Sequence, residues 1–406
     1  MVHALRLALL SIALLGTFTS TVYLFLVLAA ALRFHLRSRR AETPVSATDL
    51  PPLSVLKPVH GAEPRLDKNI ASFFSQSYPE YELIFCARHL TDAAMKVVDQ
   101  VQASTPSRVQ ARKIECGEPP WVNPKIWSLD ALLRAAAHQC IVITDSDVKV
   151  GENFLRNVAP PLADPTVGMV TCLYRGVPTG GPWSRLEALG MSVEMSSGVL
   201  VADMMEGMQF ALGPCMATKK SAIAAIGGVA RLADYLADDF VLGNWISRAG
   251  LKVALATEII DHVVTNTAFL PSMRHQVGWA RSTRFSRPLG HLGSVLTFAM
   301  PFAMLGCVSE CLLGNWRLGL GLLAWGIVNR VVQALAVGWG VVKDRESPAW
   351  CLLYPLRDLM GFLFWIWGYL SDDVRFRGEI YTLYADGKIR LKHHNRGDVD
   401  GTACVS

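Results

Sequence analysis

Two aspartates, at positions 145 and 147 of this 406-residue sequence, have a side-chain type and a spacing that suit a functional site. They follow the apolar run 141–144 in "IVITDSDVKV", which has strong strand propensity. If the strand continues through them, side-chain alternation puts Asp145 and Asp147 on one side and Ser146 on the other. Carboxylates paired in this way could hold a divalent cation. Asp-Ser-Asp after a strand is also ordinary turn chemistry, so the motif alone leaves both interpretations open.

A second acidic pair, Asp238 and Asp239, stands in "YLADDFVLGNWISRAG" (235–250). The pattern predicts a helix with both acids near its start. The usual explanation for such a pair is that acids near a helix N-terminus complement the helix dipole. As with the first pair, the surrounding elements must decide between a structural and a functional role.

The elements that must position these acids lie between residues 53 and 265, where strand-like and helix-like patterns alternate. Strands are expected at 53–58, 81–87, 108–115 and 140–147, and helices at 63–77, 91–104 and 125–138. This alternation predicts an α/β domain around a mostly parallel sheet. Ligands of such sheets bind at the carboxyl ends of the strands, which is where Asp145 and Asp147 are expected. The sequence contains neither GxGxxG nor GxxxxGK[ST], so neither a classical dinucleotide fold nor a P-loop is supported.

The composition points to a membrane protein. Half of the residues (51%) are hydrophobic and the mean hydropathy is +0.29, which is too apolar for an ordinary soluble protein. The net charge of +5 gives no case for nucleic acid as a partner. The nine cysteines form no CxxC pair and no metal spacing, so we expect reduced thiols in a cytosolic setting.

The N-terminal region is expected to anchor the chain in the bilayer. Residues 8–32 are uncharged and long enough to span it as a helix, and the basic cluster "RFHLRSRR" follows. Because positive charge stays inside, the N-terminus should lie outside and everything after residue 33 should be cytoplasmic. We therefore assign residues 1–40 to an anchor with its basic stop and residues 41–52, rich in proline, to a linker.

The C-terminal membrane segments, residues 289–371, contain three apolar runs at about 289–313, 317–342 and 349–370. The turn "GNWR" predicts a helical hairpin between the first two. Three full spans would place the basic tail (372–406) outside, so one run, most simply 349–370, is expected to be re-entrant or interfacial. Charges inside the runs should face protein, water or each other; they are Arg330, Arg357 and Asp358.

A basic segment, "SMRHQVGWARSTRFSRP" (272–288), lies just before these runs. We predict an interfacial helix over 266–288 that touches lipid headgroups. Its arginines surround Trp279 and are Arg274, Arg281, Arg284 and Arg287.

In their order along the chain, these motifs resemble the ceramide glucosyltransferase family of membrane-bound GT-A glycosyltransferases. The resemblance covers about residues 1 to 395. The matching stretches are "LSVLKPVHG" (53–61), "VNPKI" (122–126), "DSD" (145–147), "GPCMATKKSAIAAIGG" (213–228) and "LADDF" (236–240). It implies an α/β GT-A (Rossmann-like) catalytic domain over 53–265, with one N-terminal transmembrane helix and a C-terminal cluster of membrane helices.

Two family motifs depart from their usual form. Where the family's first acidic motif places an aspartate, this chain has His89, and Asp92 follows three residues later. The (Gln/Arg)-x-x-Arg-Trp motif reads "HQVGW" (275–279), with Gly278 at the arginine position. We expect Arg281 or Arg274 to substitute, or else weaker binding of the donor phosphates.

The resemblance also implies the role of each site residue. Asp239 would be the catalytic base, and Asp147, with Asp145, would hold Mg²⁺ or Mn²⁺ at the diphosphate of a UDP-sugar. Asp238 is expected to be only a helix-start acid. Residues implied to contact the nucleotide sugar are Asp145, Lys125, Asn123, Asp92, Trp279 and Arg281.

The implied acceptor is a membrane lipid of the ceramide or hopanoid type. Bacterial hopanoid glycosyltransferases look similar, so an integral protein of a bacterial inner membrane is expected. A methionine-rich stretch, residues 191–208, could contact the lipid, although such a stretch is more often core. The alternatives are a processive polysaccharide synthase, which would normally need more membrane helices, and a non-enzymatic membrane scaffold, which would not need these motifs in this order.

Overall fold

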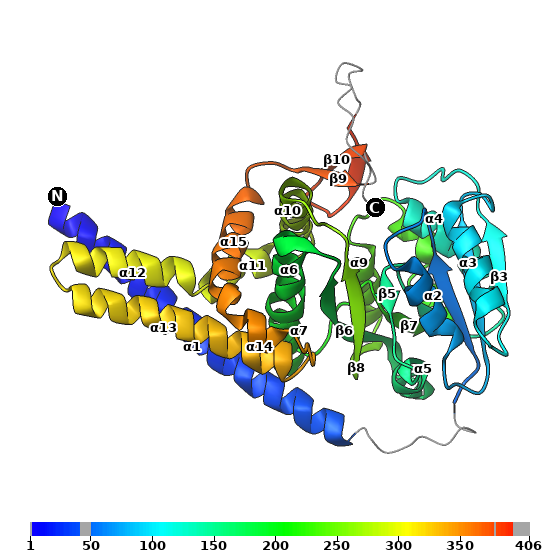
Figure 1. The fold of residues 1–406 in the computed structure, drawn as a ribbon. Coiled ribbons are helices and arrows are strands. Elements are labelled where there is room, and N and C mark those ends of the chain that lie inside the picture. The colour runs from blue at the N-terminus through cyan, green and yellow to red at the C-terminus, as the bar shows by residue number, and fades with distance from the viewer. Residues whose placement is uncertain (1, 41–49, 377–378, 393–406) are drawn as a thin grey trace. The chain divides into compact units, whose positions relative to one another are not determined.

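The computed structural model describes residues 2–40, 50–376 and 379–392 (Figure 1). Contacts between residues divide the chain into two compact units. The unit that we call the membrane unit comprises residues up to 37, 180–204 and 266–374. The unit that we call the sheet unit comprises residues 38–179, 205–265 and those from 375 onward. Most of the expected linker, residues 41–49, lies outside the described residues.

The sheet unit is built on an eight-stranded sheet in the order β3-β2-β1-β4-β7-β6-β8-β5. Strands β1 to β4 are mutually parallel, whereas β7 runs antiparallel to both of its neighbours and β5 runs antiparallel to β8. The expected α/β class with a mostly parallel sheet is therefore confirmed: β6 runs parallel to β8, and six of the eight strands share one direction, with β7 and β5 reversed. The strands are Leu53–Pro58 (β1), Tyr81–Ala87 (β2), Ala111–Glu115 (β3), Cys140–Ile143 (β4), Val148–Lys149 (β5), Val167–Pro178 (β6), Met216–Lys219 (β7) and Lys252–Val264 (β8).

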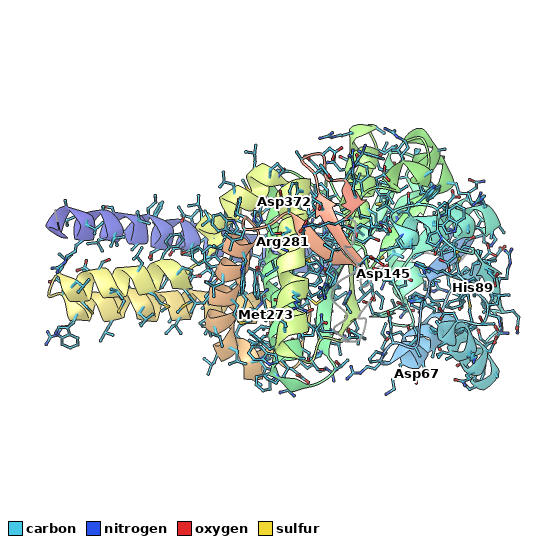
Figure 2. All side chains as sticks on the ribbon, turned by 90° about the horizontal axis from the view of Figure 1, so that it is seen from above. Asp67, His89, Asp145, Met273, Arg281 and Asp372 are labelled. Atoms are coloured by element: carbon cyan, nitrogen blue, oxygen red, sulfur yellow. The ribbon has the colours of Figure 1, made fainter. Side chains whose placement is uncertain are left out.

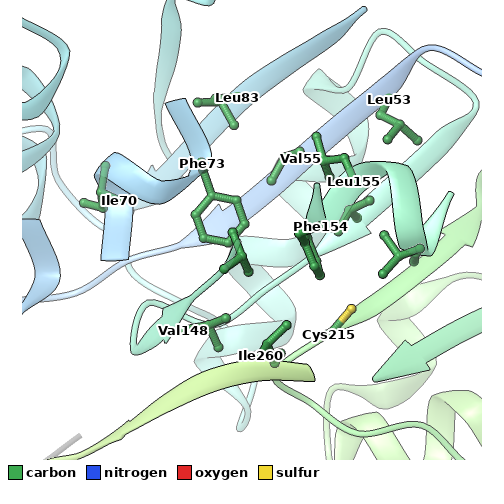
Figure 3. Packing of buried hydrophobic residues seen from close by; sticks show 14 of the residues in the cluster. Leu53, Val55, Ile70, Phe73, Leu83, Val148, Phe154, Leu155, Cys215 and Ile260 are labelled. Carbon is green, nitrogen blue, oxygen red and sulfur yellow. The ribbon is translucent and has the colours of Figure 1, made fainter. Parts of the chain in front are cut away.

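Amphipathic helices pack on this sheet around a buried core (Figure 3). Phe73 of α2 contacts Phe154 of α5 edge to face, with ring centroids 6.1 Å apart. Val55 and Ile260, from strands of both halves of the sheet, belong to the same cluster. The helices of the sheet unit are Leu66–Phe74 (α2), Ala93–Ser104 (α3), Pro124–Ala135 (α4), Phe154–Val158 (α5), Lys220–Ala225 (α8) and Asp238–Arg248 (α9). The helix expected over 235–250 is thus confirmed as α9.

The strand that precedes the two motif aspartates is shorter than expected. β4 ends at Ile143, and residues 144–147 form a loop before β5. Side-chain alternation along a strand therefore does not govern Asp145 and Asp147, and that expectation is wrong. The loop's own contacts, described below, orient the two carboxylates.

The C-terminal segment expected as a basic tail, residues 372–406, forms three short strands where the structure describes it. They are Asp373–Phe376 (β9), Glu379–Leu383 (β10) and Ile389–Leu391 (β11). The sequence analysis did not anticipate strands in the tail.

The membrane unit contains long apolar helices (Figure 1). Three segments are long and apolar enough to cross a membrane: Ala4–Arg40, Trp316–Trp339 and Ser347–Trp367. Because it contains these helices, the chain is a membrane protein. The expected hairpin is confirmed, because α12 packs on α13, where Gly319 and Gly326 allow close approach to Cys307 and Ala303. The helices of this unit are Val2–Arg40 (α1), Gly181–Leu189 (α6), Ser196–Met205 (α7), Phe269–Ser286 (α10), Pro288–Ser294 (α11), Met300–Leu312 (α12), Trp316–Ala334 (α13), Ser347–Trp350 (α14) and Tyr354–Trp367 (α15).

The first C-terminal apolar run is broken. Its two halves, Pro288–Thr297 and Met300–Leu312, are bent by 46° and would make a fourth span only if they count as one. The charges inside the other two runs meet at this break, as we expected for charges in apolar segments. Asp358 accepts hydrogen bonds from the backbone N–H groups of Ala299 (3.0 Å) and Met300 (2.8 Å), and Arg330 donates to its other carboxylate oxygen at 3.0 Å. Whether the run at 349–370 is re-entrant stays a prediction.

Candidate active site

The loop that carries the first acidic motif is held by the buried lysine of β1. Lys57 is fully buried and donates hydrogen bonds to the Thr144 hydroxyl (2.9 Å) and to the Asp145 carbonyl (2.8 Å). Asn69 donates to the Ser146 carbonyl at 3.1 Å. These contacts fix the backbone of residues 144–147, so that the side chain of Asp145 is free to face other groups. The sequence analysis missed Lys57, although it stands inside a motif that carries the resemblance.

Lys125 lies in the first turn of α4 and is no surface lysine. Its side chain is 16% exposed, and its ammonium lies 2.7 Å from Asp145 and 3.8 Å from Asp238. Burial acts to lower the pKa of Lys125, but the carboxylates of Asp145, Asp238 and Asp239 outweigh it and raise the pKa above its ordinary value. Lys125 is therefore the cation around which the two acidic motifs meet.

Asn123 places Lys125 by capping α4. Its side-chain oxygen accepts hydrogen bonds from the backbone N–H groups of Lys125 (3.0 Å) and Ile126 (3.4 Å), and its amide donates to the Tyr235 carbonyl at 2.8 Å. The residue is 1% exposed. These contacts give it a positioning role, and its expected contact with the nucleotide stays a prediction.

The second acidic motif begins α9 and joins the same cluster. Asp239 accepts hydrogen bonds from the backbone N–H groups of Gly213 (2.6 Å) and Phe240 (2.8 Å). A Cβ atom at Gly213 would lie 2.9 Å from Asp239 and 3.5 Å from Asp145, so only glycine leaves room for these carboxylates. Asp238 is 7% exposed beside Lys125, and the expectation that it is merely a helix-start acid is wrong because it is buried in the cluster.

His262 is a second residue that the sequence analysis missed. Its Nε2 atom lies 3.4 Å from the carboxylate of Asp147, and β8 places it opposite Val148 in the ladder with β5. Its ring packs against Tyr174, with centroids 5.3 Å apart. Because a histidine 115 positions from the motif shares no local pattern with it, only the pairing of β5 with β8 reveals the contact.

The acidic cluster, which we define as Asp145, Asp147, Asp238 and Asp239 with Lys125, holds more negative than positive charge. Burial raises the pKa of Asp238 to about 6, with Lys125 opposing the shift and the neighbouring carboxylates adding to it. Burial also raises the pKa of Asp147 and that of Asp239. Burial lowers the pKa of the adjacent Lys57 to about 7. Several perturbed groups at the carboxyl ends of strands are typical of an active site.

The carboxylate oxygens of the acidic cluster meet part of what a hard divalent cation requires. The Oδ1 atom of Asp147 is buried and has no hydrogen-bond partner, as an atom that awaits a ligand would be. Carboxylate oxygen is the ligand that Mg²⁺ and Mn²⁺ prefer. Over the described residues, however, no three side chains of the metal-binding types converge on one point. Asp147 and Asp145 are thus the residues that could hold the ion, with water and substrate oxygens completing its coordination.

A hollow opens at the carboxyl ends of β1 and β2, next to α4. Asp92 borders this region rather than lining it: its carboxylate caps α3 and accepts hydrogen bonds from the backbone N–H groups of Ala94 and Gly61, both at 2.8 Å. His89, at the position of the missing aspartate, is about half exposed and lies 3.3 Å from Glu118. The hollow is lined by Pro58, Val59, His60, Arg88, Pro119, Pro124, Trp127 and Ser128. Figure 2 labels Asp145 and His89 within the sheet unit.

Trp279 and Arg281 belong to α10 of the membrane unit and are described in their own surroundings. Arg281 donates a hydrogen bond to the Asp373 carbonyl, and burial lowers its pKa. Figure 2 shows Arg281 next to Asp372, which pairs with Arg284. A Cβ atom at Gly278 would have no atom within 4 Å, so the backbone there leaves room for a side chain to begin. The expected contacts of Trp279 and Arg281 with the donor stay predictions.

The chain is a glycosyltransferase with an α/β fold and apolar helices. The sequence model of glycosyl transferase family 21 matches residues 10–389, and the chain belongs to this family. The resemblance to ceramide glucosyltransferases is thereby confirmed.

Individual relatives agree with this assignment. The chain is similar to ceramide glucosyltransferase 1 of Caenorhabditis elegans, with 27% identity over 59% of this chain and 51% of that protein. It is also similar to ceramide glucosyltransferase 3 of the same organism, with 26% identity over 84% of this chain and 75% of that protein. The match thus spans about half the length of the first relative. Among solved structures, a mannosyltransferase from Pyrobaculum calidifontis in complex with GDP-Man and Mn²⁺ aligns with 86% of this chain and 99% of its own, at 19% identity and a TM-score of 0.44.

Proposed function

We propose that the protein transfers a hexose or an N-acetylhexosamine from a UDP-sugar to a hydroxyl group of a membrane lipid of the ceramide or hopanoid type. The observation that carries the proposal is the acidic cluster, in which two motifs far apart in sequence meet around Lys125 at the carboxyl ends of the strands. The relatives named as ceramide glucosyltransferases support a glucosyl donor and a ceramide-type acceptor.

The donor half of the reaction requires a diphosphate to leave with its charge neutralised. Mg²⁺ or Mn²⁺, when bound by Asp147 and Asp145, would supply that positive charge. Lys125 contributes a fixed cation, and Lys57 and Asn69 keep the motif loop in place. The hollow bordered by Asp92 is the proposed seat of the nucleotide base.

The acceptor half requires a base. The lipid hydroxyl oxygen forms a bond to the anomeric carbon while the bond from that carbon to the phosphate oxygen breaks, and UDP leaves with the electron pair. Asp239 takes the hydroxyl proton. Backbone N–H groups hold both of its oxygens, which fixes the direction from which the proton can be received. Because this is a single displacement, the anomeric configuration inverts.

The apolar helices suit a lipid acceptor, since they keep the enzyme in the bilayer that contains it. In the methionine-rich stretch, Met191 is buried in its unit, whereas Met205 is 63% exposed, so the stretch is not uniformly core. We propose that the sheet unit faces the cytoplasm, where UDP-sugars are made, with the basic residues at the C-terminal end of α1 on that side.

The test is transfer by the purified full-length chain in a lipid extract. UDP-glucose and UDP-N-acetylglucosamine are supplied separately, and the product is identified by mass spectrometry and its anomeric configuration by NMR. A single sugar added to a lipid with inverted configuration supports the proposal. A growing polysaccharide would point to a processive synthase, and no transfer from either donor with any lipid fraction would refute the proposal.

A further inference from the structure

A buried arginine in the membrane unit pairs with a carboxylate that is partly exposed. Arg357 of α15 has a side chain that is 7% exposed, and Glu194 has one that is 39% exposed. The Nη2 atom of Arg357 lies 2.9 Å from the Oε2 atom of Glu194. Glu194 belongs to a π-helical turn, Gly190–Met195, and such turns are frequent at functional sites. The pair is therefore accessible from its Glu194 side.

Glycines on two elements leave room for this pair. A Cβ atom at Gly190 would lie 2.4 Å from the Nε atom of Arg357. A Cβ atom at Gly361 would lie 3.2 Å from the Oε1 atom of Glu194 and 3.3 Å from the Nη1 atom of Arg357. Any larger residue at either position would therefore crowd the space in which the two charged side chains meet.

The pair leaves several hydrogen-bonding atoms unused. The Nε and Nη1 atoms of Arg357 and the Oε2 atom of Glu194 are buried and have no hydrogen-bond partner among the described residues. Arg330, in the same unit, uses all three of its guanidinium nitrogens. An unpaired buried donor is costly, above all among apolar helices, so the guanidinium of Arg357 should bind an oxygen from outside the chain.

The charge and the surroundings of the pair define the ligand. Glu194 already balances the charge of Arg357, so an anion would leave one negative charge uncompensated. An uncharged group that both accepts and donates, such as an amide or two adjacent hydroxyls, can bond to both partners. The guanidinium lies over the ring of Phe364, 5.3 Å from its centroid, and Phe298 packs beside Gly361. These rings suit the apolar chains of a lipid.

We propose that Arg357 and Glu194 bind the polar group of an uncharged membrane lipid. The guanidinium donates to a carbonyl or hydroxyl oxygen, and the carboxylate accepts from an amide N–H or a second hydroxyl. A ceramide presents the amide, and a hopanoid polyol presents adjacent hydroxyls. Where this lipid is also the acceptor, the inference rests on the proposed function. The residues that form the site all belong to the membrane unit.

The test compares three variants of the full-length chain in nanodiscs. Arg357→Met keeps an unbranched side chain but removes the donors. Glu194→Gln keeps the size of the side chain but removes its charge. Arg317→Gln, at an exposed position of α13, is the control for the loss of a positive charge in this unit. Melting temperatures establish that each variant is folded.

The nanodiscs are doped with one lipid at a time, and native mass spectrometry measures how much of it the protein retains. The probes are a ceramide, a hopanoid polyol, phosphatidic acid and a triacylglycerol, which accepts hydrogen bonds but has none to donate. The parent and Arg317→Gln should retain the ceramide or the polyol above the other two, and the retained lipid identifies the source.

The two site variants should change this preference in different ways. Arg357→Met should lower retention of the preferred lipid about tenfold. Glu194→Gln leaves the guanidinium without a counter-charge, so this variant should lose the uncharged lipid and gain phosphatidic acid. Because the side chain of Glu194 is partly exposed, its variant keeps the test decisive even if Arg357→Met does not fold.

The proposal is overturned if the parent prefers phosphatidic acid, if it prefers none of the four lipids, or if Glu194→Gln retains them as the parent does. Water alone would then complete the site. These readouts need no turnover. Retention of an uncharged lipid without sugar transfer would therefore refute the proposed function alone, whereas transfer by a parent that prefers no lipid would refute this site alone.

Discussion

Buried charges occur in both units of the molecule, and a balanced pair in one unit contrasts with an unbalanced cluster in the other. In the membrane unit, Arg330 and Asp358 are 2% and 3% exposed and form a one-to-one pair. Asp358 also caps the broken helix, and Arg330 donates further hydrogen bonds to Asn329 and to the Thr297 carbonyl. In the acidic cluster, four carboxylates surround Lys125, and one oxygen of Asp147 has no partner.

The difference separates charges that stabilise a structure from charges that await a ligand. A structural pair should satisfy all its hydrogen-bonding groups, because each buried unsatisfied group is costly. Burial raises the pKa values of Asp147, Asp238 and Asp239, which means that the folded protein resists holding all of these negative charges at once. A cationic ligand would remove this strain, whereas the membrane pair needs nothing more.

The largest effect is expected from Asp239→Asn. Asparagine keeps the shape of the side chain but cannot take the proton, so kcat should fall by about 10²–10⁴-fold with donor binding nearly unchanged. Single-turnover kinetics and calorimetry with UDP would measure the two separately. Turnover close to that of the parent would show that another group is the base.

The balanced pair should respond in stability rather than turnover. Arg330→Met or Asp358→Leu alone leaves one buried charge without a partner and should lower the free energy of unfolding by about 3–5 kcal/mol. The double variant Arg330→Met/Asp358→Leu removes both charges and should recover most of the loss. Denaturant titration of the protein in detergent would measure all three.

Two outcomes would contradict this comparison. If the double variant were as unstable as the worse single variant, the pair would matter mainly through its caps on the helix break. If either single variant lost turnover while remaining fully folded, the membrane pair would have a functional role and the contrast with the acidic cluster would fail.

Sequence reasoning reached the local features of this molecule more readily than the distant ones. The acidic motifs, Lys125, the α/β class and the helical hairpin could all be predicted, because local patterns or the family resemblance encode them. The direction of β7 could not, since a strand of only four residues pairs equally well either way. The role of His262 could not, because it depends on the register of β8 against β5.

The burial of individual charged side chains was the second feature that the sequence did not reveal. Lys57 reads as an ordinary residue near the end of a strand, and only the packed structure shows its ammonium 3.8 Å from the Phe73 ring centroid and bonded to the motif loop. Asp238 reads as a helix-start acid until α4 brings Lys125 beside it. In both cases the side chain's environment comes from elements distant in sequence, which no local pattern reports.

A smaller effect is expected from His262→Phe. The imidazole lies beside Asp147 and orients its carboxylate, so its loss should raise the concentration of Mg²⁺ or Mn²⁺ needed for half-maximal activity by about 10–100-fold. Asp147→Asn should shift the same curve at least as far. His138→Phe, elsewhere in the sheet unit, is the control. Full activity of the parent in excess chelator would remove the metal from the mechanism altogether.

The smallest effect separates Asp238 from its neighbour. The unfolded chain releases this proton near the ordinary aspartate pKa of 3.8, whereas burial holds the folded-state pKa at about 6. Between these values the folded state binds more protons than the unfolded state, so the contribution of Asp238 to stability falls as pH rises from about 4 to 6 and stays low above that. Asp238→Asn has no carboxyl group to titrate there. Its stability relative to the parent should therefore increase by an amount on the order of 1–3 kcal/mol from pH 4 to pH 8, and melting temperatures at the two pH values would measure it. Asp99→Asn, at an exposed site, controls for the loss of a negative charge.

A gain in stability that is equal at both pH values would mean that Asp238 is not held protonated by burial. A loss of turnover as large as that of Asp239→Asn would mean that the base has been assigned to the wrong carboxylate.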